Sequence, residues 1–179
     1  MDATEASRLI EAAVPSGPAV WADFGAGDGT FTRALAARLG PGGRILAVDR
    51  DARALERLRR ASAHAEAEVV IVPADLERAF ELPGLRAHAL DGMLLANTLH
   101  FMGDAAGVLA RLATWLRPGG SVVVVEYDGR SPSRWVPYPI DAAALPDLFA
   151  AAGLAPPQIV ARADSRFGGE LYVAAARVR

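Results

Sequence analysis

The sequence contains no cysteine, which excludes disulfides, thiolate metal sites and cysteine nucleophiles. It also contains no lysine, because all 19 basic residues are arginines. Schiff-base chemistry through a lysine and a P-loop lysine are therefore excluded. Long apolar runs are missing too: the longest strongly apolar stretch is about Val122 to Val125, whereas a membrane-spanning helix needs about 20 such residues.

An excess of either charge is also absent. The formal net charge is -2 at pH 7, so the global electrostatics do not point to nucleic acid or to an anionic membrane as a partner. The chain starts with the acidic segment Met1 to Glu5, unlike the positively charged start of a signal peptide, so we expect a cytoplasmic protein. No His, Asp or Glu cluster has the spacing of metal ligands, so no metal site is expected.

The composition is that of a single globular domain, with 52% hydrophobic and 22% charged residues in a chain of 179. Short apolar runs alternate with amphipathic stretches. Strands are expected at 19–23, 44–48, 68–72, 90–96, 121–126, 158–163 and 170–176. Helices are expected at 4–14, 31–39, 52–63, 105–116 and 141–152, and a Pro-Gly-Gly turn at 116–120.

This alternation indicates βαβ units, in which helices cover both faces of a parallel sheet. The link between the last two strands is too short for a helical crossover, so these strands should form an antiparallel hairpin. The expected fold class is α/β: a single doubly wound, mostly parallel seven-stranded sheet, Rossmann-like, with an antiparallel last strand.

The segment Asp23 to Thr30, Asp-Phe-Gly-Ala-Gly-Asp-Gly-Thr, follows the first strand and opens a helix. Glycines there let the backbone turn sharply and approach a ligand closely. A dinucleotide fold prefers G-x-G-x-x-G, but the third glycine of that pattern would fall on Thr30. Asp23 would repel a pyrophosphate and suit an ammonium group, which favours an amino-acid-bearing nucleoside over NAD. A tight turn without any ligand is the alternative.

Acidic residues also follow the second and third strands. Asp49 stands where a carboxylate can accept hydrogen bonds from both ribose hydroxyls; it could instead cap the next helix, although Asp51 would serve equally well. Asp75 could accept from an adenine amino group while Leu76 packs on the base. A solvated loop residue or a helix cap is the alternative for Asp75.

With these features the sequence resembles the class I S-adenosylmethionine-dependent methyltransferases, specifically their small-molecule branch. The matching pieces occur in the family's order and cover residues 19–127: Asp23 to Gly29, Ala47 to Asp49, Pro73 to Asp75, Leu90 to His100, and Leu116 to Gly120 with its apolar strand. The terminal hairpin also resembles the family's reversed last strand.

The resemblance implies roles for individual residues. Asp23 and the glycine loop would hold the methionine part of S-adenosylmethionine, Asp49 the ribose and Asp75 the adenine. The full set of implied cofactor contacts is Asp23, Gly25, Ala26, Gly27, Asp49, Arg50, Ala74, Asp75, Leu76, Asn97 and Thr98. The implied organisation is one domain, with an N-terminal helix at 1–14, a cofactor-binding core at 19–127, and an acceptor-side segment with the terminal hairpin at 128–179.

The methyl acceptor is less well specified. His100 is a candidate general base, with a pocket-wall or capping histidine as the alternative. Tyr127, Trp135 and Tyr138 are candidate substrate-binding residues, but the proline-rich segment that contains Trp135 and Tyr138 could equally be a packed connector or a dimer contact. Arg166 and Phe167 are a second candidate wall. The N-terminal helix could be a lid over the cofactor or could simply pack on the domain.

These observations predict a methyltransferase that moves a methyl group from S-adenosylmethionine to a small-molecule acceptor by in-line displacement. S-adenosylhomocysteine would be the product. A non-catalytic S-adenosylmethionine-binding sensor or subunit is the alternative, and a Rossmann dehydrogenase is disfavoured by Thr30 and Asp23. We expect no nucleic-acid or membrane partner, and the sequence leaves a homodimer open.

Overall fold

A computed structural model describes residues 1–165 and 168–178. The helices are α1 (Ala3–Leu9), α2 (Thr30–Leu39), α3 (Ala52–Ala61), α4 (Ala105–Ala113) and α5 (Leu145–Ala151), with 3-10 turns η1 (Leu99–Phe101) and η2 (Ala142–Ala144). The strands are β1 (Val20–Phe24), β2 (Arg44–Asp49), β3 (Glu68–Pro73), β4 (Leu90–Ala96), β5 (Leu116–Asp128), β6 (Gln158–Asp164) and β7 (Glu170–Arg177).

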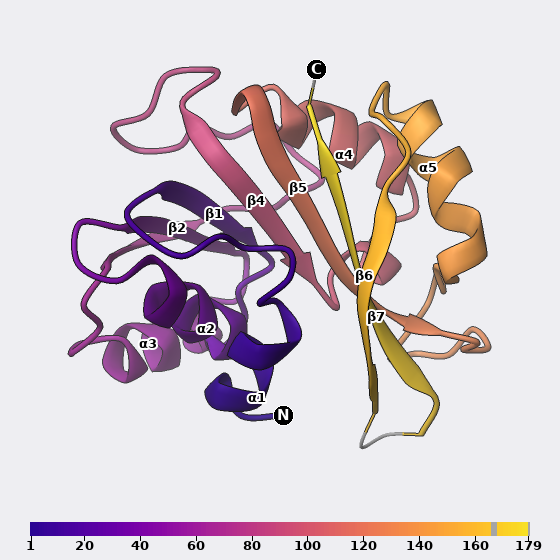
Figure 1. The fold of residues 1–179 in the computed structure, drawn as a ribbon, viewed down its shortest axis with the longest axis horizontal. Helices are drawn as coiled ribbons and strands as arrows, with labels where there is room; N and C mark the ends of the chain where they lie inside the picture. Colours follow the sequence, from indigo (N-terminus) through magenta and orange to yellow (C-terminus); the bar gives the residue numbers. More distant parts are fainter. Residues whose placement is uncertain (166–167, 179) are drawn as a thin grey trace.

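The strands form one seven-stranded sheet in the order β3-β2-β1-β4-β5-β7-β6 (Figure 1). β1 to β5 pair in parallel, whereas β7 runs antiparallel to both β5 and β6. This arrangement confirms the predicted α/β fold class and its reversed last strand. Because β1, β2 and β4 are parallel, their carboxyl ends meet at one edge of the sheet, where ligands of such folds bind.

Helices cover both faces of the sheet (Figure 1). One face packs against α1 and α2 through side chains such as Trp21 and Leu35, and α3 packs on the same face beside Ala47. The other face packs against α4 and α5 through side chains such as Leu109 and Phe149. Burial on both faces explains why the central strands are continuous apolar runs rather than alternating ones.

The helix starts follow local capping chemistry. The Asp51 side chain accepts hydrogen bonds from the backbone N–H groups of Arg53 and Ala54 and so caps α3, which leaves Asp49 free for another role. α1 begins at a capping box between Asp2 and Glu5. The sequence pattern predicted that this helix continues to residue 14, but it ends at Leu9. Residues 10–14 form turns instead.

The predicted turn at residues 116–120 is wrong: these residues form the first part of β5. Their partner is distant in the sequence, since the N–H of Gly119 donates to the Val178 carbonyl and the N–H of Val178 donates to the Gly120 carbonyl. Helix 105–116 ends earlier, at Ala113, and helix 141–152 is divided into η2 and α5. Within residues 1–165 and 168–178, no helix combines the length and apolar character that crossing a membrane requires.

Candidate cofactor and acceptor site

Two adjoining cavities lie at the carboxyl ends of β1, β2 and β4. The smaller, about 400 Å³, is lined by Gly25, Gly27, Asp49, Arg50, Asp51, Ala54, Ala74, Asp75, Leu76, Glu77, Asn97, Thr98, Phe101 and Met102. The larger, about 940 Å³, is lined by Met1, Glu5, Leu9, Asp23, Gly25, Ala26, Gly27, Asp28, Thr30, Phe31, Ala96, Asn97, Tyr127, Ala163, Asp164, Ser165 and Leu171. Gly25, Gly27 and Asn97 line both and mark where they join.

The glycine loop passes so close to β4 that a side chain cannot be added. Gly25 has a φ of 80°, and a Cβ built on it would lie 2.3 Å from Oγ1 of Thr98. The N–H groups of Gly25 and Ala26 both donate to the Val48 carbonyl, which ties the loop to β2. The glycine is therefore required by this close approach as well as by its backbone conformation.

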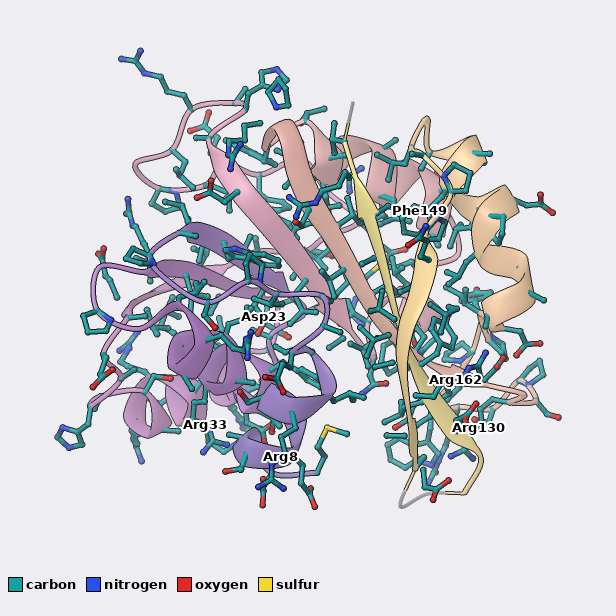
Figure 2. All side chains as sticks on the ribbon, in the orientation of Figure 1. Arg8, Asp23, Arg33, Arg130, Phe149 and Arg162 are labelled. Carbon is teal, nitrogen blue, oxygen red and sulfur yellow. The ribbon has the colours of Figure 1, made fainter. Side chains whose placement is uncertain are left out.

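Asp23 is buried at the end of β1, with 1% of its surface exposed, and lines the larger cavity. Figure 2 shows it well inside the molecule. The hydroxyl of Thr32 donates to Oδ2 at 2.6 Å, and no described residue hydrogen-bonds to Oδ1. Burial, with a smaller contribution from the nearby Asp49 charge, raises the pKa of Asp23 to about 7. A cation in the cavity would favour its ionised form.

Asp49, at the end of β2, is held by two backbone groups. The N–H of Gly27 donates to Oδ2 at 2.8 Å and the N–H of Asp51 donates to Oδ1 at 2.8 Å. Each carboxylate oxygen accepts two hydrogen bonds, so both oxygens can still accept from a ligand in the smaller cavity. Asp49 thus also fixes the glycine loop, a role that the sequence pattern did not indicate.

The residues after β3 line the smaller cavity, as the predicted adenine contacts require. Ala74, Asp75 and Leu76 all face it, and Leu76 is 5% exposed. Asp75 accepts a hydrogen bond from the N–H of Glu77, but no helix follows over residues 76–80. The helix-cap alternative for Asp75 is therefore not realised.

Asn97 lies at the junction of the two cavities in a backbone conformation that is unusual for a residue with a side chain, with a φ of 53°. Its Oδ1 is buried, and no residue in the described part of the chain hydrogen-bonds to it. A buried carbonyl oxygen without a partner costs free energy, so a ligand N–H or O–H at this point would be stabilising. Thr98 is buried beside it, and its hydroxyl donates to the Ala96 carbonyl at 3.1 Å.

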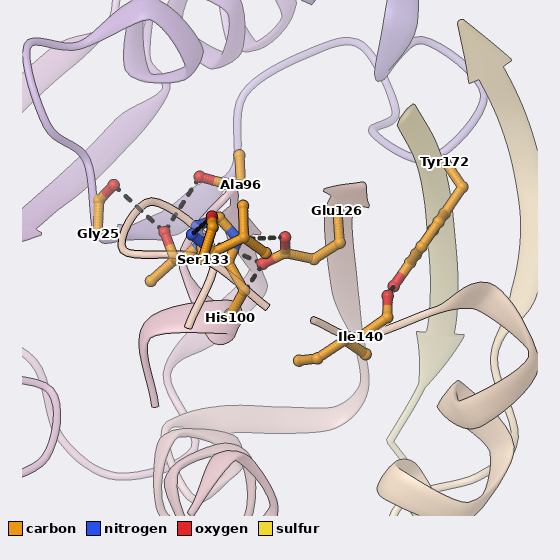
Figure 3. A network of polar contacts seen from close by, with 9 residues as sticks. Gly25, Ala96, His100, Glu126, Ser133, Ile140 and Tyr172 are labelled. Carbon is orange, nitrogen blue, oxygen red and sulfur yellow. Dashed lines mark hydrogen bonds and ion pairs between the residues drawn. The ribbon is translucent and has the colours of Figure 1, made fainter. Parts of the chain in front are cut away.

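His100 is part of a buried polar network with Glu126, a residue that the sequence interpretation missed (Figure 3). Nδ1 of His100 lies 2.6 Å from Oε2 of Glu126, and Oε1 accepts from the N–H groups of Thr98 and His100. An ionised Glu126 side chain only accepts hydrogen bonds, and opposite it Nδ1 of His100 would be the donor. Glu126 stands two residues before the end of β5, where the strand-end reasoning used for Asp49 could have found it.

The candidate acceptor residues do not all reach the cavities. Tyr127 lines the larger cavity, and the Arg130 guanidinium lies 4.9 Å from its ring centre. Trp135 is 68% exposed and Tyr138 is 54% exposed, and neither lines either cavity. His100, 2% exposed, also lies outside both linings. Arg166 and Phe167 lie outside the described residues.

No sequence pattern singled out the remaining cavity residues one by one, although the N-terminal helix was a candidate lid over the cofactor. Met1, Glu5 and Leu9 of the N-terminal segment line the larger cavity, and Phe101 and Met102 after β4 line the smaller one. The position of α1 over the cavity depends on its packing against α2 and β6, which lie far away in the sequence. Long-range packing of this kind leaves no local pattern.

Comparison with known proteins identifies the family. Residues 22–122 match the model of a family described as a methyltransferase domain. The chain is 34% identical over 134 residues to the biotin biosynthesis bifunctional protein BioCD of Bordetella avium, covering 73% of this chain and 26% of that protein. It is 34% identical over 119 residues to an uncharacterized methyltransferase of Mycobacterium tuberculosis, covering 66% of this chain and 56% of that protein. The chain thus spans between about a quarter and just over half of these relatives' lengths.

Solved structures share the fold. A methyltransferase dependent on S-adenosylmethionine from Aquifex aeolicus superimposes with a TM-score of 0.77 at 13% identity, covering 98% of this chain and 90% of that one. A Burkholderia thailandensis 1,6-didemethyltoxoflavin-N1-methyltransferase with bound S-adenosylhomocysteine has a TM-score of 0.72 at 24% identity, covering 98% and 77%. At these identities the likeness shows the fold alone. The family match over more than half of the sequence establishes that the chain belongs to a family of methyltransferase domains, and its fold is the one found in S-adenosylmethionine-dependent methyltransferases.

Proposed function

We propose that this chain transfers a methyl group from S-adenosylmethionine to a small-molecule acceptor. The adenosyl part would lie in the smaller cavity, and the methionine part would extend past Gly25 and Asn97 into the larger one. The observation that carries this proposal is the pair of adjoining cavities joined at the glycine-rich loop and flanked by Asp23 and Asp49.

The residues present fit such a donor chemically. Asp49 offers acceptor capacity for two ribose hydroxyls, and Asp75 offers a carboxylate to an adenine amino group, with Leu76 and Phe101 as apolar surfaces for the base. Asp23 and the unpartnered Oδ1 of Asn97 suit the donor ammonium group. Arg50, Ala74, Ala26, Gly27 and Thr98 complete the proposed lining.

The bound donor supplies a methyl group on a sulfonium, which already has a good leaving group. The protein's task is therefore to orient the acceptor and exclude water. Tyr127 lines the larger cavity opposite the glycine loop and offers a flat wall against which an acceptor can pack. Leu9 and Leu171 add apolar surface at the same cavity.

We propose a positioning role for His100 rather than proton transfer. Its side chain is buried, lies outside both cavity linings, and is held by Glu126. The same carboxylate accepts from the Thr98 N–H, so the pair fixes the backbone that carries Asn97 and Thr98 at the cavity junction. This favours a role without proton transfer, which was the alternative to a general base, although His100 does not itself form a cavity wall.

Donor affinity should depend on pH through Asp23. Below about pH 7 this carboxyl is mostly protonated, so binding an ammonium group there requires loss of a proton. As the pH rises from 6 to 8, affinity for S-adenosylhomocysteine should increase roughly fivefold if the cation lowers the pKa by about one unit. Calorimetric titrations should find this slope absent in Asp23→Asn and retained in Asp147→Asn, which changes an exposed carboxylate on α5. An unchanged slope in Asp23→Asn would contradict the assignment.

The proposed reaction can be tested without knowing the acceptor. The protein is incubated with isotopically labelled S-adenosylmethionine and a metabolite extract, and labelled products are identified by mass. We expect one or a few labelled small molecules, none of which forms with the boiled protein. Micromolar donor binding without any transfer to such an extract would favour the sensor alternative. Binding of NAD in place of S-adenosylhomocysteine would contradict both the methyltransferase proposal and the sensor alternative.

A further inference from the structure

We infer that Thr32 is a positioning residue for the methyl donor. Its hydroxyl holds one oxygen of the Asp23 carboxylate, which leaves the other oxygen and the negative charge available to a cationic group in the larger cavity. The inference rests on the proposed function. It goes further because Thr32 lines neither cavity and acts on the donor only through Asp23.

Thr32 lies in the first turn of α2, the helix that begins directly after the glycine loop. Its side chain is fully buried, and its hydroxyl donates to Oδ2 of Asp23 at 2.6 Å. A threonine hydroxyl inside a helix can instead donate to a backbone carbonyl of the preceding turn. Here the hydroxyl reaches the end of β1, so it ties α2 to the carboxylate and restricts the rotation of that carboxylate.

This hydrogen bond affects the charge of Asp23 as well as its orientation. Burial raises the pKa of Asp23 to about 7, and the Thr32 hydroxyl opposes this increase because it stabilises the ionised form. The side chain of Asp23 is 1% exposed, so little water can reach Oδ2 in place of the hydroxyl. Without the hydroxyl, Oδ2 would be buried without a partner, and Asp23 would remain protonated to a higher pH.

The charged groups around Asp23 do not replace this stabilisation. Asp49, at the end of β2, raises the pKa of Asp23 further. Within the described lining of the larger cavity, β4 and α2 contribute only uncharged residues. The other charged groups there are Glu5 of α1, which lies 3.7 Å from the Met1 amino group, Asp28 of the glycine loop, which lies 3.7 Å from the Arg57 guanidinium, and Asp164 of β6.

Thr32→Val removes the hydroxyl and keeps the shape of the side chain. The pKa of Asp23 should rise by about one, and the affinity for S-adenosylhomocysteine should fall about threefold at about pH 7. At about pH 8.5 the loss should be less than about 1.5-fold, because Asp23 is then mostly ionised in both proteins. A structural disturbance of the cavity would instead weaken binding equally at both pH values.

Two measurements test these expectations. Carbon-13 NMR of the ligand-free protein gives the pKa of Asp23, whose carboxyl signal is identified by its absence from Asp23→Asn. Calorimetric titration at both pH values gives the affinity for S-adenosylhomocysteine. Thr32→Ser restores the hydroxyl and should return both quantities to their native values. Thr114→Val is the matched control and should change neither, because the hydroxyl of Thr114 donates to a backbone carbonyl at the exposed end of α4.

The outcomes separate this inference from the proposed function. An unchanged pKa of Asp23 in Thr32→Val, or an equal loss of affinity at both pH values, would overturn the inference and leave the proposed function standing. Thr32→Ala removes the same hydroxyl and should give the same shift in pKa, so it serves as the test variant if the valine variant does not fold. Failure of the native chain to bind S-adenosylhomocysteine at either pH would overturn the proposed function and this inference together.

Discussion

Asp49→Ala should weaken the binding of S-adenosylhomocysteine by about 5- to 150-fold, the equivalent of about 1–3 kcal/mol. The substitution removes the charged acceptor proposed for the ribose hydroxyls. It also releases the N–H of Gly27, which donates to Oδ2 of Asp49 in the free protein, so the glycine loop loses one of its anchors. Isothermal titration calorimetry of the two proteins measures this difference directly.

Two control variants separate the two contributions of Asp49. Asp49→Asn keeps one acceptor oxygen and the approximate shape of the side chain. Its affinity for S-adenosylhomocysteine should therefore lie between the affinities of the native protein and of Asp49→Ala. Asp51→Ala removes the cap of α3 and should cost about 1 kcal/mol of stability, with a much smaller effect on affinity. Binding of S-adenosylhomocysteine to Asp49→Ala with native affinity would contradict the assignment of Asp49 to the ribose hydroxyls of the donor.

Glu126→Ala should lower the free energy of unfolding by about 3–5 kcal/mol. Glu126 is 1% exposed, and its carboxylate accepts from Nδ1 of His100 and from two backbone N–H groups. Alanine would leave all three donors buried without a partner. Urea unfolding followed by circular dichroism gives the change in stability, and Glu81→Ala, at an exposed position, should have almost no effect.

Glu126→Gln distinguishes a specific network from general packing. The amide oxygen can still accept from the backbone N–H groups of Thr98 and His100, but the amide nitrogen would then face Nδ1 of His100 as a second donor. The imidazole should respond by moving its proton to Nε2, which nitrogen-15 chemical shifts of the ring report. A glutamine variant with the native tautomer would contradict the hydrogen-bond assignment.

The fold could be predicted from the sequence because most of its signals are local. β4 occupies residues 90–96 as predicted, since an apolar run followed by a helical stretch specifies a buried parallel strand. The prediction failed at residues 116–120, where proline and two glycines indicate a turn by local rules. There the backbone pairs with Val178, and that partner is invisible to any window of nearby residues.

The site was predictable only in part, for a related reason. The position of Asp23, Asp49 and Asp75 beside the cavities could be predicted because a strand end is readable in the sequence, and parallel strands bring such ends together. Trp135 and Tyr138 were chosen for their aromatic character in a segment after β5, yet both are largely exposed and lie outside both cavities. Where an irregular segment packs depends on distant surfaces, and composition does not encode it.

The insertion of β7 between β5 and β6 has a consequence for the order of assembly. During synthesis, residues 158–164 emerge before 170–177, yet β6 joins the sheet only through β7. Strands β1 to β4, whose carboxyl ends border the smaller cavity, can associate first through shorter chain closures. The half of the cleft that contains Asp164 and Leu171 must come together last. The smaller cavity, proposed for the donor, therefore assembles before the wall of the larger cavity, proposed for the acceptor, is complete.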